Sequence, residues 1–421
     1  MTQPHRVHVI GAGVAGLAAS LALAEAGVGV VLHEAAPQAG GRCRSYLDPV
    51  LGCRIDNGNH LLIAGNRAAM RYLTAIGATD SLTGPGDAIF PFFDVTTGER
   101  WALRPNAGRL PWWILSADRR AKGTGPRDYL AARRLLDAPK SAVVTDFLDP
   151  GTVIFRRLWQ PLAVAALNTE AEACSAALFG QVLRESLGAG GAASIPLVPR
   201  EGLSESFIDP ALAKLRVLGA EIRMPSRLRA IGFERRSAAT LDFESAHEPL
   251  RPGEAAVLAV SAPVAARLVP ELDIPDEFRA IVNAHYRVTL RGDAPWFVGV
   301  IGGVAEWVFR KREVLSVTVS AADRIVDRPA EDLAAILWRD AAAAFDLAPE
   351  PLPPWQIVKE KRATFAATPK QAARRPGPAA LGGNLVLAGD WTDTGLPATI
   401  EGAIRSGFAA ADVLLGRNQT R

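Results

Sequence analysis

Three glycines near the start of the chain have the spacing of a turn that holds a phosphate group. Gly11, Gly13 and Gly16 lie between the β-branched run 6–10 and the apolar run 15–26. We expect a strand, a tight turn at Gly11 and a helix, with Gly13 leaving room for a pyrophosphate and Gly16 packing close to the strand. The N–H groups and positive dipole end of the helix would face the phosphates. The predicted phosphate contacts are Gly11, Gly13, Val14, Ala15 and Gly16.

An acidic residue follows the second predicted strand. Residues 28–32 form an apolar run, and Glu34 comes just after it. At this position a carboxylate accepts hydrogen bonds from the adenosine ribose, whereas an Arg would favour a 2′-phosphate. A lone glycine motif is a weak signal, but the strand, the helix, the second strand and the acid agree here. The sequence therefore predicts a dinucleotide-binding α/β domain.

A second glycine turn departs from the pattern of nicotinamide enzymes. Gly40, Gly41 and Arg42 follow Glu34 after a short loop. This motif resembles the second signature of the amine-oxidase and carotenoid-desaturase class of flavoproteins. The resemblance implies that both glycines pass near the pyrophosphate of FAD and that Arg42 supports the phosphate and the flavin. Taken alone, a glycine turn with a surface Arg explains the motif equally well.

The C-terminal region matches the other half of the same signature. The apolar strand 384–388 runs into a Gly-Asp pair, and a helix is predicted over 398–415, with Gly407 allowing close packing. Asp390 suits the ribityl hydroxyls, and the helix start would stabilise negative charge at N1 and O2 of reduced flavin. An amphipathic C-terminal helix with an ordinary cap is the alternative. The predicted flavin contacts are Gly389, Asp390, Thr399 and Ile400.

The length of 421 residues predicts two domains, because single cores stop growing at about 250–300 residues. We expect an α/β fold (α+β overall): a Rossmann-like FAD-binding domain of the amine-oxidase or glutathione-reductase type, with an inserted, discontinuous substrate-binding domain. Residues 212–231 suggest a helix, a turn at Gly219 and two strands, and 255–260 a further strand. The class resemblance implies that Leu228 covers the adenine with its backbone. The predicted domains are 1–75, 196–275 and 375–421 for FAD, and 76–195 and 276–374 for substrate.

Three further segments narrow the resemblance. These are the Asp-Asn-Gly-Asn-His run 56–60, the segment 159–169 with its Pro-Leu and Leu-Asn-Thr pieces, and 389–402. Together they resemble the squalene-associated FAD-dependent desaturase-like family, better described as the hydroxysqualene dehydroxylases of bacterial hopanoid biosynthesis. Asn59 stands where Gln is expected in that family. The resemblance implies that reduced FAD, recharged by an external electron donor, gives a hydride to hydroxysqualene, whose hydroxyl leaves as water.

His60, Asn168 and Thr169 are the candidate catalytic residues. His60 follows the glycine turns, and a neutral His can give a proton or a hydrogen bond to a leaving hydroxyl. A structural His bonded to a backbone carbonyl is the alternative. Asn168 and Thr169 are candidates for contact with the same hydroxyl. Asp56 is interpreted as structural or as a partner of Arg42, and Gly58, Asn59 and His60 are also predicted to contact the cofactor.

An apolar C30 substrate needs an apolar tunnel, and the predicted substrate segment is rich in suitable side chains. For any single one of them, ordinary core packing is the competing interpretation. The candidate lining residues are Phe90, Phe92, Phe93, Trp112, Trp113, Ile114, Phe155, Trp159 and Phe179.

The charge of the chain indicates which kinds of partner it can bind. The net charge of +3 does not suggest a nucleic-acid binder, whose basic residues would dominate a domain. Residues 100–140 nevertheless hold ten Lys and Arg against three Asp, together with Trp101, Trp112 and Trp113. Such a segment is either a surface for an anionic membrane or a solvated helix face.

The remaining features bear on the compartment. Three cysteines without framework spacing favour a reducing environment, and no signal peptide is expected because the first strand begins at about Arg6. The glycines in 7–32 argue against a membrane span there. No metal-binding cluster is expected. We therefore expect a cytoplasmic protein that is peripheral on the inner face of the bacterial cytoplasmic membrane.

Two other functions fit the same fold. One is a carotenoid (phytoene-type) desaturase or another FAD-dependent oxidase, in which hydride moves from substrate to FAD. The other is a non-catalytic lipid carrier without FAD, which the complete set of glycines, Glu34 and Asp390 disfavours.

Overall fold

A five-stranded parallel sheet carries the first glycine turn. The computed structural model describes residues 3–235, 237–290, 292–379, 381 and 383–417. The sheet has the order β10–β2–β1–β14–β20, and every pair in it is parallel. Its inner strands are continuous apolar runs, as a sheet covered on both faces requires. The strands are β1 (Arg6–Ile10), β2 (Gly29–His33), β10 (Glu221–Arg223), β14 (Glu254–Leu258) and β20 (Leu385–Leu387).

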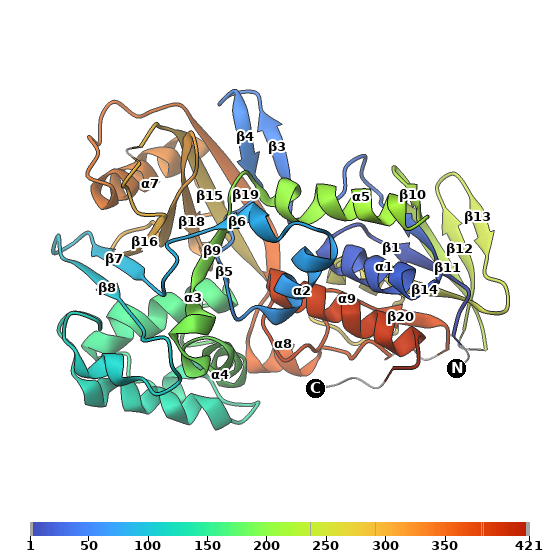
Figure 1. Ribbon diagram of the computed structural model, residues 1–421, viewed down its shortest axis with the longest axis horizontal. Helices are drawn as coiled ribbons and strands as arrows, with labels where there is room; N and C mark the ends of the chain where they lie inside the picture. Colours follow the sequence, from blue (N-terminus) through green and yellow to red (C-terminus); the bar gives the residue numbers. More distant parts are fainter. Residues whose placement is uncertain (1–2, 236, 291, 380, 382, 418–421) are drawn as a thin grey trace.

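The first and last long helices pack side by side on this sheet (Figure 1). They are α1 (Val14–Glu25) and α9 (Ile400–Leu414). A Cβ at Gly407 would lie 2.1 Å from the carbonyl oxygen of Ala15, so glycine permits this close approach, as the sequence predicts. Helices α2 (Arg67–Ala75) and α5 (Asp209–Val217) flank the pair: α2 contacts α9, and α5 contacts α1.

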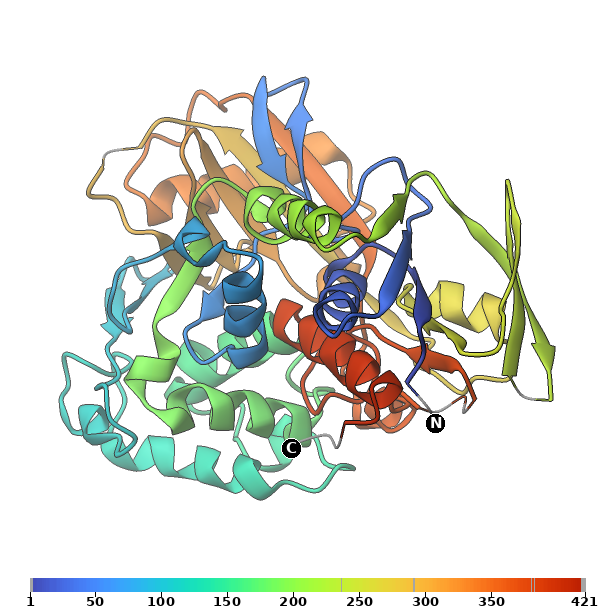
Figure 2. The same cartoon turned by 45° about the vertical axis from the view of Figure 1, so that its right-hand side comes forward.

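A three-stranded antiparallel sheet lies at one end of the molecule, beyond the parallel sheet (Figure 2). It consists of β11 (Leu228–Glu234), β12 (Ser237–Phe243) and β13 (His247–Pro249). Helix α6 (Ala262–Leu268) contacts β11. The helix, turn and two strands predicted for 212–231 are therefore present, with Gly219 at a φ of +81°.

A seven-stranded sheet forms the second large layer, in the order β19–β15–β18–β17–β16–β7–β8. Helix α7 (Ala330–Ala344) covers one face, onto which Val282, Ala284 and Tyr286 point. Because side chains alternate along a strand, Asn283 and His285 point to the opposite face. The strands are β7 (Phe90–Asp94), β8 (Arg100–Leu103), β15 (Phe278–Arg287), β16 (Phe297–Ile301), β17 (Trp307–Arg310), β18 (Val314–Val319) and β19 (Trp355–Phe365).

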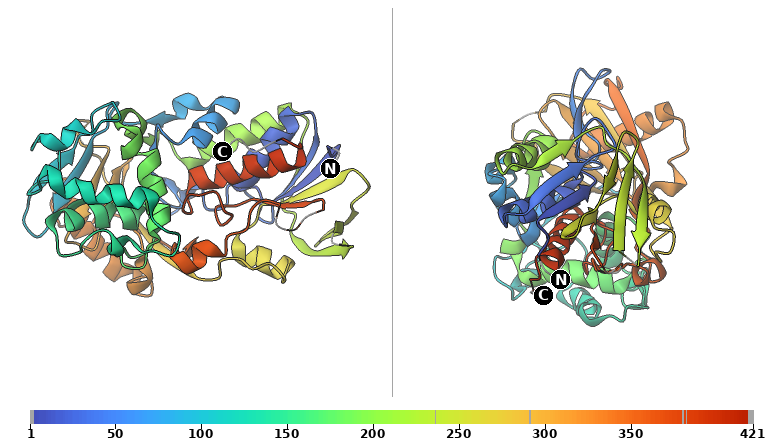
Figure 3. Two further views of the ribbon diagram at one scale, coloured as in Figure 1. Left: turned by 90° about the horizontal axis from the view of Figure 1, so that it is seen from below. Right: turned by 90° about the vertical axis from the view of Figure 1, so that its right-hand side faces the viewer.

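A helical lobe fills the end of the molecule opposite to β11–β13 (Figure 3). Aromatic side chains form its core, where the Trp113 and Tyr129 rings meet edge to face at 5.2 Å. Of the nine candidate tunnel residues, only Trp112 and Ile114 are not buried, so most of the set packs as core. The helices are η2 (Trp112–Leu115), η3 (Pro126–Asp137), η4 (Val144–Asp146), η5 (Phe155–Trp159), α3 (Gln160–Leu167), α4 (Ala176–Glu185), η6 (Leu187–Ala189) and η7 (Gly191–Ser194).

Short elements connect these layers. The remaining strands are β3 (Ser45–Asp48), β4 (Cys53–Asp56), β5 (Leu62–Ile63), β6 (Leu82–Thr83) and β9 (Pro196–Pro199), and the remaining helices are η1 (Thr79–Ser81), η8 (Ser204–Ile208), η9 (Ala322–Arg324) and α8 (Pro369–Ala373). All strands of the parallel sheet come from the three segments predicted to bind FAD, although the domain boundaries themselves stay a prediction. Among the described residues, no helix is long and apolar enough to cross a bilayer.

Candidate functional site

The first glycine turn leaves an open space at the N-terminus of α1. Gly11 has a φ of +109°, and a Cβ at Gly16 would lie 1.8 Å from the Gly11 carbonyl oxygen, so both must be glycine. Gly13 has an ordinary φ of −74°, and a Cβ there would meet nothing within 4 Å. No side chain caps α1, Gly13 forms a parallel bridge with Gly40, and the N–H group of Ala15 has no partner in the described part of the chain. Open space beside a free helix-start donor fits a diphosphate.

Glu34 lies directly beside this space. Its carboxylate accepts hydrogen bonds from the backbone N–H groups of Ala12 at 2.8 Å and Ala36 at 2.9 Å. Each carboxylate oxygen keeps a second lone pair for a ribose hydroxyl. The Ser226 N–H donates to the Glu34 carbonyl at 2.6 Å, which brings the start of β11, and thus Leu228, next to Glu34. This placement agrees with a predicted adenosine site.

The second glycine turn packs on the first. The Gly40 N–H donates to the Ala12 carbonyl at 2.8 Å. Gly40 and Gly41 have φ values of +110° and +56°, which explains why both are glycine. A Cβ at Gly41 would lie 3.8 Å from the Gly13 Cα, so both turns border the same space.

Arg42 joins the two ends of the chain. Its guanidinium donates to Asp390 Oδ1 at 2.8 Å and to the Ala363 carbonyl. The charge of Asp390 raises the pKa of Arg42, against the opposing effect of burial. Asp390 Oδ2 has no hydrogen-bond partner among the described residues, so this oxygen can accept from a ribityl hydroxyl. Arg42 therefore pairs with Asp390 and not with Asp56, the partner that the sequence had suggested.

A buried arginine that sequence reasoning missed holds the loop after Gly389. Arg375 donates to the carbonyls of Asp390, at 3.3 Å, and Thr392, and its guanidinium lies 4.9 Å from the Phe365 ring centroid. Burial lowers the pKa of Arg375 to about 10. The residue follows no motif, and only the fold brings it to this loop.

The start of α9 presents free donors. Thr399 caps the helix by accepting from the Gly402 N–H at 3.0 Å, while the N–H groups of Ile400 and Glu401 have no partner in the described chain. The buried Glu401 carboxylate in turn caps α2, accepting from the N–H groups of Ala68 at 3.0 Å and Ala69 at 2.8 Å. No sequence motif indicates this role of Glu401, which fixes the helix start against α2.

Asp56 anchors the loop that carries the candidate catalytic residues. Its carboxylate accepts from Ser45 Oγ at 2.6 Å and the Leu203 N–H at 2.9 Å, and it forms an ion pair with Lys311. Burial alone would raise the pKa of Asp56, but the Lys311 charge and these hydrogen bonds hold it below its usual value. Asp56 is thus structural, which is one of the two roles that the sequence analysis considered for it. Its charged partner is Lys311.

Asn59 belongs to a polar network across the seven-stranded sheet. Its amide donates to Thr318 Oγ1 at 2.9 Å, and Thr318 donates to Asn283 Oδ1 at 2.7 Å. Asn283 donates to the Asn57 carbonyl at 3.4 Å, and Gly58 lies against the same amide. The amide oxygen of Asn59 is buried without a partner among the described residues. An unsatisfied buried acceptor suits a ligand hydroxyl.

His60 is half-buried next to this network. Its ring makes no hydrogen bond within the described part of the chain, so the carbonyl-bonded structural His is not observed there. Burial lowers the pKa of His60 to about 4; Asp56 opposes this effect, whereas Lys311 and Arg42 add to it. The imidazole is therefore neutral near pH 7 and has a ring N–H to offer.

Asn168 and Thr169 are both buried and tied to the fold. Asn168, at a φ of 49°, donates to Thr364 Oγ1 and the Arg279 carbonyl and accepts from the Ala321 N–H at 2.7 Å. Thr169 donates to the Leu167 carbonyl and accepts from the Ala367 N–H at 2.9 Å. These partners use both amide N–H donors and the hydroxyl proton. The predicted contact of Asn168 and Thr169 with a substrate hydroxyl stays a prediction.

Comparisons with known proteins agree with this geometry. The family model "Flavin containing amine oxidoreductase" matches residues 14–291 and 302–415. The hydroxysqualene dehydroxylase of Rhodopseudomonas palustris is 48% identical over 410 residues, which cover 97% of this chain and 98% of the relative. That of Sinorhizobium fredii is 46% identical over 417 residues, covering 99% and 100%.

Solved structures show the same fold. Cyclohexylamine oxidase from Brevibacterium oxydans superposes with a TM-score of 0.70 at 17% identity, covering 98% of this chain and 99% of that one. No group of His, Cys, Asp and Glu side chains that could hold a metal ion occurs among the described residues.

The family model and the two relatives show that the chain belongs to the flavin-containing amine oxidoreductases and, among them, to the hydroxysqualene dehydroxylases.

Proposed function

We propose that the chain binds FAD and catalyses the reductive dehydroxylation of hydroxysqualene to squalene. The observation that carries the proposal is the near full-length similarity to two hydroxysqualene dehydroxylases, in a chain whose two glycine turns lie side by side, with Glu34 bonded to the Ala12 N–H and Asp390 to Arg42. When bound, FAD supplies the hydride in its reduced form. The carbon–oxygen bond of the substrate breaks, the oxygen takes a proton and leaves as water, and the carbon takes the hydride. An external electron donor must then reduce the flavin again.

The chain's own residues fit FAD in sequence order. The start of α1 and the two glycine turns face the diphosphate, and Glu34 accepts from the ribose. Asp390 accepts from the ribityl chain with Oδ2 while Arg42 holds its other oxygen. The free N–H groups at the start of α9 lie where the pyrimidine end of the flavin collects negative charge.

Asn59 and His60 are suited to the departing hydroxyl. We infer that the buried amide oxygen of Asn59 accepts the substrate O–H, and that the neutral ring of His60 donates its N–H to the same oxygen. The cation left behind is allylic and delocalised, so orientation and the exclusion of bulk water carry much of the rate. A His with a pKa near 4 is rarely protonated at pH 7, so the proton comes through a water molecule and not from a charged imidazole.

The low water solubility of the substrate indicates where in the cell the protein would work. A C30 isoprenoid alcohol partitions into lipid, so we propose that the protein works at the inner face of the bacterial cytoplasmic membrane, in peripheral contact with anionic lipid.

Product analysis tests the reaction. The purified protein is reduced under anaerobic conditions and incubated with hydroxysqualene, and the products are identified by mass spectrometry. The proposal predicts squalene and flavin that has returned to its oxidised form. Formation of a more unsaturated product by oxidised protein would support a desaturase instead, and a protein that retains no flavin would support a lipid carrier.

A further inference from the structure

We propose that the tip of the helical lobe docks the protein on an anionic lipid surface. The docking face consists of Leu110, Trp112 and Leu115, together with the basic side chains around them. This inference rests on the proposed function in one respect: a lipid-soluble substrate explains why the protein would bind a membrane. The binding itself depends only on the surface described below.

Three large apolar side chains project from one short stretch of chain. Leu110 is 80% exposed, Trp112 52% and Leu115 69%. Single exposed apolar residues are ordinary, but a cluster within one helical turn marks an interaction site. Helix η2 lies within this stretch, at the outer end of the lobe.

The protein holds these side chains out in a fixed arrangement. The neighbouring Trp113 is buried against Tyr129 and anchors η2. Asn106, also buried, donates to the carbonyls of Gly108 at 3.1 Å and Leu110 at 3.0 Å, and it accepts from the Trp113 N–H at 3.2 Å. The apolar tip is therefore built into the fold and is not the frayed end of a loop.

Basic residues surround the apolar tip. The Arg119 guanidinium lies 4.7 Å from the centroid of the Trp112 ring, and Arg120 donates to the carbonyls of Ile114 and Leu115. Exposed Trp and Leu with Arg beside them are typical of surfaces that insert among lipid headgroups.

Helix η3 adds further exposed basic and apolar side chains next to the docking face. It packs on η2 through Tyr129, which is buried together with Ala132. In a 3₁₀ helix, residues three apart lie on one face, so Arg127, Leu130 and Arg133 share the exposed side. One acidic residue of η3, Asp128, is used locally, because its carboxylate accepts from the Gly125 N–H at 2.7 Å.

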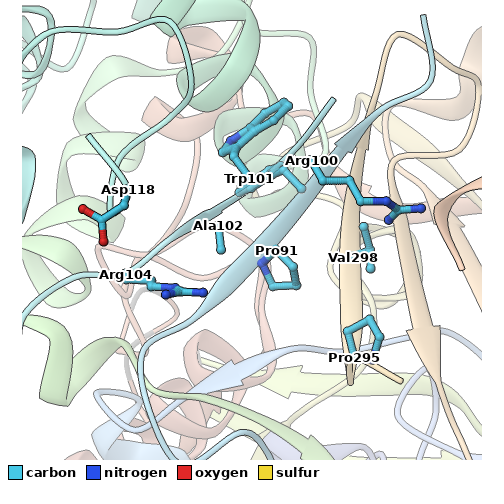
Figure 4. Close-up of a pocket in the computed structure, with 9 residues that line it drawn as sticks. Pro91, Arg100, Trp101, Ala102, Arg104, Asp118, Pro295 and Val298 are labelled. Atoms are coloured by element: carbon cyan, nitrogen blue, oxygen red, sulfur yellow. The ribbon is translucent and has the colours of Figure 1, made fainter. Parts of the chain in front are cut away.

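An open pocket adjoins the docking face and offers a place for a lipid phosphate (Figure 4). It measures about 390 Å³, and Arg100, Trp101, Arg104 and Asp118 are among the residues that line it. Arg104 and Arg119 are tied together by two hydrogen bonds, of 2.9 and 3.0 Å, between their segments. The Arg104 guanidinium has no partner in the described part of the chain, whereas Arg100 is held by Asp346. Asp118 limits the positive charge of the pocket but does not pair with Arg104.

The positive charge around the docking face indicates what binds there. An apolar tip alone would equally suit a second copy of the chain or another protein. The arginines that follow η2, those on η3 and those at the pocket favour a surface of many negative charges, and juxtamembrane basic residues are attracted to anionic lipid in this way. We therefore assign the face to anionic phospholipid.

Vesicle sedimentation tests the assignment. The flavin-loaded protein is mixed with vesicles of phosphatidylcholine, with or without phosphatidylglycerol. We expect binding to the anionic vesicles that weakens with salt, and a loss of roughly tenfold or more in partitioning when Leu110, Trp112 and Leu115 are replaced together by Ser. The matched control replaces Leu47, Val50 and Val217 by Ser, because these side chains are similarly exposed (66%, 64% and 82%) but lie on β3–β4 and α5, away from the helical lobe.

Turnover of hydroxysqualene dispersed in detergent separates this inference from the proposed function, because a variant with only Leu110 and Leu115 replaced by Ser should bind vesicles less well and keep that activity. Equal binding of the docking variant and the wild-type protein would overturn the inference, as would equal binding to neutral and anionic vesicles. Lipid-independent dimerisation that the same three substitutions abolish would also overturn it, since the face would then be an interface between two copies. Failure to reduce hydroxysqualene, with vesicle binding intact, would overturn the proposed function alone.

Discussion

Arg42 and Asp390 lie 348 positions apart in the chain and are joined by a hydrogen bond of 2.8 Å between the guanidinium and the carboxylate. The bond connects the glycine turn after β2 to the loop after β20. The predicted flavin site therefore takes residues from both ends of the chain. Asp390 Oδ2 and the N–H groups of Ile400 and Glu401 have no partner among the described residues, and we expect them to contact FAD together.

Disruption of this pair tests the joint site. We expect Arg42→Met to lower flavin content, because Asp390 is then no longer oriented, and Asp390→Ala to lower it by removing the acceptor. Combined in one protein, the two changes should lower FAD affinity by less than the sum of the single effects, since residues in direct contact couple. Affinity for FAD is measured by fluorescence titration of the apoprotein. Strictly additive effects would mean that the two residues act on FAD independently.

Gly13 is the position where a side chain would block the cofactor without straining the chain. Its φ of −74° suits any residue, and a Cβ would meet nothing. We expect Gly13→Val to fold normally but to purify without FAD, because the added methyl groups occupy the place of the pyrophosphate. The matched control is Gly108→Val, an exposed glycine where a Cβ meets only a side chain at 3.8 Å. A Gly13→Val protein with full flavin absorbance would show that the phosphate lies elsewhere.

The buried pair of Asp56 and Lys311 should dominate the acid stability of the site loop. The pKa of Asp56 is held below its usual value, so the stabilisation is present above the unfolded-state pKa of about 4 and is lost as the pH falls through the lower, folded-state pKa. Lys311→Met leaves the Asp56 carboxylate buried without its partner, which costs about 3–5 kcal/mol in typical cases. In that variant the pKa of Asp56 rises toward or above its unfolded-state value, so acid removes less stability than in the wild-type protein, and the difference between the two proteins shrinks as the pH falls.

Urea unfolding measured across this pH range checks the expectation. Lys361→Met is the control, because Lys361 pairs with Asp327 on the exposed surface and should change the midpoint little. Equal midpoints for the Lys311 and Lys361 variants would contradict a structural role for the buried pair.

Some of this site could be predicted from the sequence, and some could not. The strand, glycine turn, helix and acid from Arg6 to Glu34 are local, so spacing alone places them, and the same holds for the strand and helix around Asp390. No local pattern tells which distant strands meet. Sequence reasoning therefore missed that Lys311 pairs with Asp56 and that Thr318 and Asn283 support Asn59.

Asn168 and Thr169 come from the Leu-Asn-Thr piece that carries the family resemblance. Tertiary contacts that no local pattern shows use their donors within the fold, and their contact with the substrate hydroxyl stays a prediction.

His60 should act through its neutral ring. Burial lowers its pKa to about 4, so kcat should show no inflection from this residue between about pH 5.5 and 8. We expect His60→Ala to keep FAD and to slow turnover by roughly 10²-fold, the loss typical of a donor aimed at developing charge. His60→Gln should recover most of the rate, because its amide also donates a hydrogen bond. A wild-type rate that rises as the pH falls, lost in His60→Gln, would show instead that a protonated ring delivers the proton.

The anaerobic half-reaction tests the central claim most directly. The flavin of the purified protein is bleached by photoreduction, hydroxysqualene is added without oxygen, and the flavin absorbance is followed while squalene is quantified. The account predicts that the oxidised flavin spectrum returns and that one squalene forms for each flavin reoxidised. A flavin that stays reduced in the presence of hydroxysqualene, or that is reoxidised without forming squalene, would contradict it.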